Sequence, residues 1–147
     1  MFAFDGGYDP GAASHTVLLE LRRTVEGHPA VRHARGDPPD QFTHVEAAID
    51  PSALGSDVDE GTLAIRWYAG ETVDARPEFA FHYSDASGFD CGWHHEPNPH
   101  VDGWAHYQER STDEEAYDYE AISFGGLHPV PLCWEILDRL ETRLGAA

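Results

Sequence analysis

The stretch FAFHYSDASGFDCGWHHEPNPHVDGWAHYQER, residues 79–110, decides the fold, because two runs in it alternate between aromatic and polar side chains around a turn. Residues 78–84 and 88–94 place large side chains at every second position, which is typical of strands with one buried face. The segment 85–88 between them consists of turn-forming residues. The pattern therefore predicts a β-hairpin.

The register of this hairpin decides which side chains share its outward face. We expect a loop with an odd number of residues, because only then do the aromatic side chains of both strands point to the core. That register places His82 opposite Asp90 and puts His94 on the same outward face. The pairing behind this expectation is Phe81 with Cys91, Tyr83 with Phe89 and Glu78 with His94.

Further imidazoles follow in the loop HHEPNPH, residues 94–100, so that residues 79–110 hold five of the ten histidines. Two prolines stiffen this loop and are expected to keep His95, Glu96 and His100 beside the end of the hairpin. If Tyr107 points to the core on the next strand, His106 and Trp104 point to the outward face.

Outside the hairpin the sequence predicts a helix from about 14 to 26, a connector over 27–41, strands at 42–49, 62–69, 104–110 and 119–124, and a C-terminal helix from Pro129 to Gly145. The order helix, about six strands, helix predicts an α+β fold: an antiparallel, meander-like sheet with the N-terminal and C-terminal helices packed on one face. The other face stays open. The 147-residue length is typical of a single domain over 1–147.

The composition indicates the salt environment of the protein more clearly than it indicates a reaction. The formal net charge is -18, nine arginines are the only Lys or Arg residues, and no lysine occurs. Molar salt shortens the Debye length to about 3 Å and removes most of the resulting self-repulsion. The chain therefore resembles a halophilic cytoplasmic protein, and its melting temperature should rise with KCl concentration. The alternative is an acidic mesophilic protein that happens to lack lysine, whose stability would not rise with salt. No apolar run approaches the roughly 20 residues of a membrane span, and the N-terminus does not resemble a signal peptide.

Two smaller features have simple structural interpretations. The cysteines Cys91 and Cys133 form no CxxC motif and fall on apolar faces, so we expect packed thiols. Four arginines form a local positive island in the acidic chain, which could contact nucleic-acid phosphates or balance nearby carboxylates. These are Arg22, Arg23, Arg32 and Arg35.

Three interpretations of the histidines remain open. The first is a divalent transition-metal site formed by His94, His95, Glu96 and His100, although the spacing matches no standard metal motif. The second is general acid-base catalysis on a phosphodiester, with His82, Asp90, His94, His100 and His106 as the catalytic set. In the third, the histidines are ordinary polar surface residues of a lysine-free chain.

The segment resembles the TumE-like family, the toxin component of a prokaryotic toxin–antitoxin pair. The resemblance covers about 30 residues and rests on His82, Tyr83, Asp85 and Gly88 in the hairpin, Trp93 at its end, Asn98, Pro99 and His100 in the loop, and His106 beyond it. This chain has Gly92 where the family tends to carry arginine, and His94-His95 where it tends to carry Asp-Asn. The resemblance implies a small α+β protein with RNA as a target and an antitoxin-like protein partner.

We thus expect the protein to cleave RNA through histidine acid-base chemistry, as a ribonuclease does, or to bind RNA. The alternative is a non-enzymatic module that binds a protein partner or a metal, and a symmetric homodimer with no other partner would favour this alternative.

Overall fold

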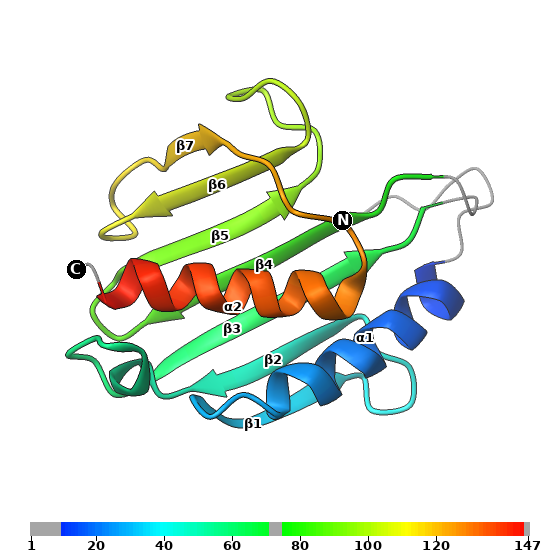
Figure 1. Ribbon diagram of the computed structural model, residues 1–147, viewed down its shortest axis with the longest axis horizontal. Helices are drawn as coiled ribbons and strands as arrows, with labels where there is room; N and C mark the ends of the chain where they lie inside the picture. Colours follow the sequence, from blue (N-terminus) through cyan, green and yellow to red (C-terminus); the bar gives the residue numbers. More distant parts are fainter. Residues whose placement is uncertain (1–9, 71–74, 146–147) are drawn as a thin grey trace.

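The computed structural model describes residues 10–70 and 75–145, which form two α-helices, one 3-10 helix and seven strands (Figure 1). In chain order these are α1 (Pro10–Glu26), β1 (Val31–Asp37), β2 (His44–Ile49), η1 (Pro51–Leu54), β3 (Gly61–Tyr68), β4 (Glu78–Asp85), β5 (Asp90–His95), β6 (Ala105–Arg110), β7 (Asp118–Ala121) and α2 (Pro129–Gly145).

The strands form one antiparallel sheet in the order of the sequence, from β1 to β7. Both helices lie on the same face, with α1 over the β1–β2 side and α2 across the middle of the sheet (Figure 1). This arrangement confirms the α+β meander with two helices on one face. None of the described helices is long and apolar enough to cross a membrane.

The strand β1 lies within the segment that the sequence predicted as a connector. It contributes only Val31 and Ala34 to the core, and its pairing with β2 shifts between Val31 and His33. Such an irregularity removes the strict alternation by which a strand is recognised in a sequence.

Apolar side chains between the sheet and the helices form the core. In α1 they are Leu18, Leu21 and Val25, and in α2 they are Leu132, Cys133, Ile136, Leu137, Leu140 and Leu144. Cys91 and Cys133 are free and fully buried, and burial raises the pKa of both thiols to about 12. As expected, both cysteines therefore serve packing rather than nucleophilic chemistry.

The loop of the central hairpin has an odd number of residues, as predicted, but the two strands pair in a different register. Phe81 pairs with Trp93 and Tyr83 with Cys91, so the predicted pairing was wrong by two residues, although the aromatic side chains still face the core. The turn explains the shift: Gly88 has φ +94° and closes a short loop bounded by the Asp85–Phe89 backbone hydrogen bond. Glycine favours this left-handed position in three-residue hairpin loops.

Candidate functional site

Five buried polar or charged side chains occur among the described residues, and all of them lie in β5 or β6. Burying a polar group is costly unless it gains partners, so their concentration in two adjacent strands marks the candidate site. Four of them point away from the helices, toward what we call the outer face of the sheet. The five are Asp90, His94, His95, His106 and Gln108, of which His95 is the exception.

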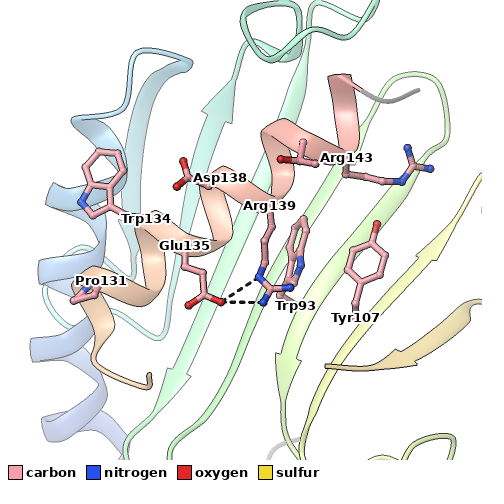
Figure 2. A pocket seen from close by; sticks show the side chains of 9 residues that line it. Trp93, Tyr107, Pro131, Trp134, Glu135, Asp138, Arg139 and Arg143 are labelled. Atoms are coloured by element: carbon pink, nitrogen blue, oxygen red, sulfur yellow. Dashed lines mark hydrogen bonds and ion pairs between the residues drawn. The ribbon is translucent and has the colours of Figure 1, made fainter. Parts of the chain in front are cut away.

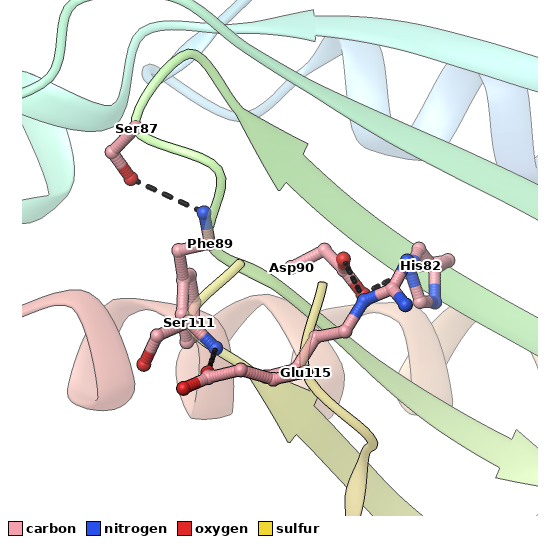
Figure 3. Close-up of polar contacts among 7 residues, drawn as sticks. His82, Ser87, Phe89, Asp90, Ser111 and Glu115 are labelled. Carbon is pink, nitrogen blue, oxygen red and sulfur yellow. Dashed lines mark hydrogen bonds and ion pairs between the residues drawn. The ribbon is translucent and has the colours of Figure 1, made fainter. Parts of the chain in front are cut away.

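A hydrogen-bonded chain links three strands on the outer face. Asp90 Oδ1 lies 3.0 Å from His82 Nε2 (Figure 3). Asp90 Oδ2 accepts a bond of 2.8 Å from Arg110 Nε. His82 was expected directly opposite Asp90, but Gly92 occupies that position, and the carboxylate reaches His82 diagonally. The guanidinium of Arg110 also stacks on Tyr117, 4.4 Å from its ring centroid. The expected His82–Asp90 pair therefore exists through a different register.

Gly92 leaves a gap toward which two imidazoles turn. A Cβ at this position would lie 2.6 Å from His82 Nδ1 and 2.7 Å from His94 Nε2. Both nitrogens of His94 are buried and lack a hydrogen-bond partner, and Glu96 Oε1 is 3.8 Å from Nδ1, too far for such a bond. The two rings therefore present ring nitrogens to one small space above Gly92.

The outer face is not open at this point, contrary to expectation. His94 stacks on His106 with 4.9 Å between ring centroids, and His106 is fully buried. The loop between β5 and β6 reaches across to β7, where His100 stacks on Tyr119 at 4.4 Å and 9°. We call His82, His94 and His106 the histidine cluster; the loop, through His100, packs beside it.

Burial lowers the pKa of His82 and of His106, and the Asp90 carboxylate only partly opposes the shift of His82. Although burial opposes it, hydrogen bonds from Tyr117 and Arg110 lower the pKa of Asp90. At neutral pH the pair therefore consists of a neutral imidazole and an ionised carboxylate. A carboxylate beside a neutral imidazole accepts its N–H and fixes the tautomer.

These shifts predict that stability falls as the pH is lowered. The ordinary histidine pKa is about 6.5, and the folded-state pKa of His82 and of His106 lies below it, so the unfolded chain takes up these protons first. The free energy of unfolding should therefore be greater at about pH 7.5 than at about pH 5.5 in constant KCl. Denaturant titrations should show a weaker pH dependence in His106→Gln than in the wild-type protein. Equal stability of the wild-type protein at both pH values would contradict the assignment.

No protein-family model, curated protein or solved structure matches the chain. The functional argument therefore rests on the side chains themselves.

The four side chains predicted to share a metal are not brought together. His95 lies on the opposite face from His94, where Nδ1 is 2.6 Å from the carbonyl of Pro77 and the ring stacks on Phe79. This follows from strand geometry, since adjacent residues of a strand point to opposite faces. Within residues 10–70 and 75–145, no three His, Cys, Asp or Glu side chains are arranged to hold a metal ion.

Trp104 also departs from expectation. It was predicted on the outer face with His106, but its ring packs against His95 at 5.3 Å and under Arg76, whose guanidinium lies 3.9 Å from the ring centroid. His106 itself occupies the outer face as predicted.

The predicted arginine island is not one surface. Arg22 pairs with Glu26 at 3.0 Å within α1, whereas Arg32 and Arg35 lie on β1 and approach Asp50 and Glu46, each at 3.6 Å. Arg23 is exposed in the last turn of α1. Three of the four arginines thus balance nearby carboxylates, in line with the simpler interpretation.

Several residues of the site were not predicted: Gly92, Gln108, Arg110, Tyr117 and Tyr119. Strand alternation could have found two of them, because Gln108 and Arg110 follow His106 at every second residue. Tyr117 gave no signal, since it precedes β7 in a segment that looked like an acidic loop.

Beside the cluster, a cavity of about 200 Å³ is lined by Arg66, Tyr68, Glu78, Phe79, Ala80, Glu96 and Pro97.

Proposed function

We propose that the histidine cluster is a proton-transfer site that cleaves a phosphodiester bond in single-stranded RNA. The observation that carries this proposal is the convergence of His82 Nδ1 and His94 Nε2 on the space above Gly92. Two imidazoles suffice for general acid-base catalysis of this reaction without a metal. The resemblance to the TumE-like family supports the same substrate class and adds an antitoxin-like partner to the proposal.

His82 takes the role of general base. Its Nε2–H donates to Asp90, so Nδ1 carries a lone pair that can accept the proton of a ribose 2′-hydroxyl. The 2′-oxygen then attacks the adjacent phosphorus, and the bond from phosphorus to the 5′-oxygen breaks. His94 gives a proton to the departing 5′-oxygen, so the products are a 2′,3′-cyclic phosphate and a 5′-hydroxyl.

Arginines on both sides of the two imidazoles suit a phosphate backbone. Arg110 lies in line with Asp90 across the sheet, and Arg66 lies in line with His94, separated from it by the small Ala80. Guanidinium groups bind phosphate oxygens through paired N–H donors. Two phosphates flanking the scissile one could therefore be held at these positions.

Substrate entry requires the loop between β5 and β6 to move. Both His94 nitrogens are shielded from solvent in the arrangement described above, and the His100–Tyr119 stack joins that loop to β7. In this proposal His100 controls access rather than transferring a proton. A substitution of His100 should therefore change the apparent affinity for RNA more than the rate at saturation.

The test is an RNA cleavage assay in molar KCl with the purified full-length chain. His82→Ala should lower the cleavage rate by about 10²–10⁴-fold. The matched control is His44→Ala, another histidine on the outer face, which should retain full activity. Cleavage that is unchanged in His82→Ala and His100→Ala would remove the assignment of this site.

The second candidate is a non-enzymatic protein-interaction module, and the burial of His94 and His106 favours it. In that case the cluster only organises the polar side of the sheet. The two functions differ in outcome: His82→Ala would then reduce stability or partner binding, and the wild-type protein would leave RNA intact. Co-purification of a small antitoxin-like protein from the native host would instead favour the RNA-cleaving candidate.

A further inference from the structure

A groove on the helix-bearing face lies beside α2, on the opposite side of the sheet from the histidine cluster. It has a volume of about 840 Å³, and Trp93 and Tyr107 of β5 and β6 lie beneath it. Figure 1 shows the reason for the groove: α2 crosses the middle of the sheet, and no helix covers β6 and β7 beyond it. Trp134 lies at one end of the groove and Arg143 at the other (Figure 2).

The same helix carries an exposed stripe next to this groove. Pro131, Trp134, Asp138 and Thr142 are exposed and follow one another at helical spacing. Trp134 is 40% exposed, and it is the one large hydrophobic side chain classed as exposed in the part of the chain described. One side of its ring lies near His28, with 5.8 Å between the ring centroids. An exposed tryptophan beside an aromatic groove is typical of an interface.

We propose that the chain forms a symmetric dimer in which α2 packs antiparallel against α2 of a second copy. One surface then supplies both the projecting side chain and the groove that receives it, as a two-fold interface requires. With the axis near Asp138, Trp134 of each copy reaches the Thr142 and Arg143 end of the other copy's groove. Self-complementarity is what favours a second copy over an unrelated partner.

Charge along α2 fits this arrangement. Glu135 and Asp138 precede Arg139 and Arg143, with Glu141 between the two arginines. An antiparallel pair whose axis lies between Asp138 and Arg139 sets Asp138 of each copy beside Arg139 of the other. Two of the nine arginines of the chain line this one groove. Two carboxylates and two guanidinium groups line the groove, so its lining has no formal net charge in a chain of net charge -18. Self-association is therefore least opposed here.

The mass in solution tests the proposal. Size-exclusion chromatography with light scattering in molar KCl should give twice the 16.3 kDa chain mass for the wild-type protein and a single chain mass for Trp134→Glu. Thr112→Glu, in the exposed loop after β6, adds the same charge outside the proposed interface and should remain dimeric. If Trp134→Glu does not fold, as judged by circular dichroism, Thr142→Glu replaces it with the same expectation.

A cross-link then locates the interface. The native cysteines are buried, so Asp138→Cys introduces one exposed thiol near the proposed axis, and it should form a disulfide-linked dimer on oxidation. Thr112→Cys, in the exposed loop after β6, should not. A monomeric wild-type protein at all concentrations, a dimer that survives Trp134→Glu and Thr142→Glu, or a dimer without the 138 cross-link would each overturn the proposal. So would a different protein bound at α2 in a one-to-one complex from the native host.

Discussion

Replacing Asp90 with asparagine is expected to lower the rate of RNA cleavage by about 10²–10⁴-fold, a larger effect than any we expect from removing an exposed side chain. The reason is the tautomer of His82. The Asp90 carboxylate only accepts hydrogen bonds, so it selects the ring form with the proton on Nε2. An asparagine amide can instead donate to Nε2, which moves the ring proton to Nδ1 and removes the lone pair that the mechanism needs.

Asp90→Asn should change the free energy of unfolding less than it changes the activation free energy of cleavage. It removes one charge from a pair with Arg110, which keeps its stack on Tyr117. Denaturant unfolding and cleavage should be measured on the same preparation, with the exposed Glu120→Gln as the control for loss of one carboxylate. If a folded Asp90→Asn protein cleaves RNA at the wild-type rate, Asp90 does not govern the chemistry.

Replacing Gly92 with alanine is expected to disrupt the site from below. The new Cβ would lie 2.6 Å from His82 Nδ1 and 2.7 Å from His94 Nε2, closer than any real contact, so both rings must turn away. Overpacking of this kind costs about 1–3 kcal/mol of stability. A displacement of the reacting groups by about 1 Å can reduce the rate about 100-fold.

Gly126→Ala is the matched control for that substitution. An added Cβ at Gly126 would meet no atom within 4 Å, so stability and cleavage should remain at wild-type values. If Gly92→Ala cleaves RNA as fast as the wild-type protein, the space above Gly92 is not where the reaction occurs.

The helices and most strands could be predicted because their core-facing side chains repeat at regular intervals. Leu132, Ile136 and Leu140 mark one stripe of α2, and Phe79, Phe81 and Tyr83 mark one face of β4. The strand β1 escaped prediction because its irregular pairing breaks this repetition. Regular burial is visible in a sequence, whereas a bulge is visible only in the pairing.

The composition of the site could be predicted better than its geometry. The odd number of residues in the hairpin loop places His82, Asp90 and His94 on one face, and that part of the prediction is confirmed. The two-residue register shift depended on which turn residue takes a positive φ, and the alternating pattern alone did not specify it. The loop that packs over β7 through His100 depends on a contact with Tyr119, which is distant in the sequence.

The most direct test of the proposed chemistry is the protonation state of the His82 ring, because it requires no knowledge of the substrate. Nitrogen-15 NMR of selectively labelled protein in molar KCl distinguishes Nε2–H from Nδ1–H, and the signals that disappear in His82→Ala identify the His82 ring. The predicted result is an Nε2–H tautomer at neutral pH whose pKa lies below the ordinary histidine value. An Nδ1–H tautomer, or a ring that is already protonated at neutral pH, would contradict the assignment of His82 as the general base.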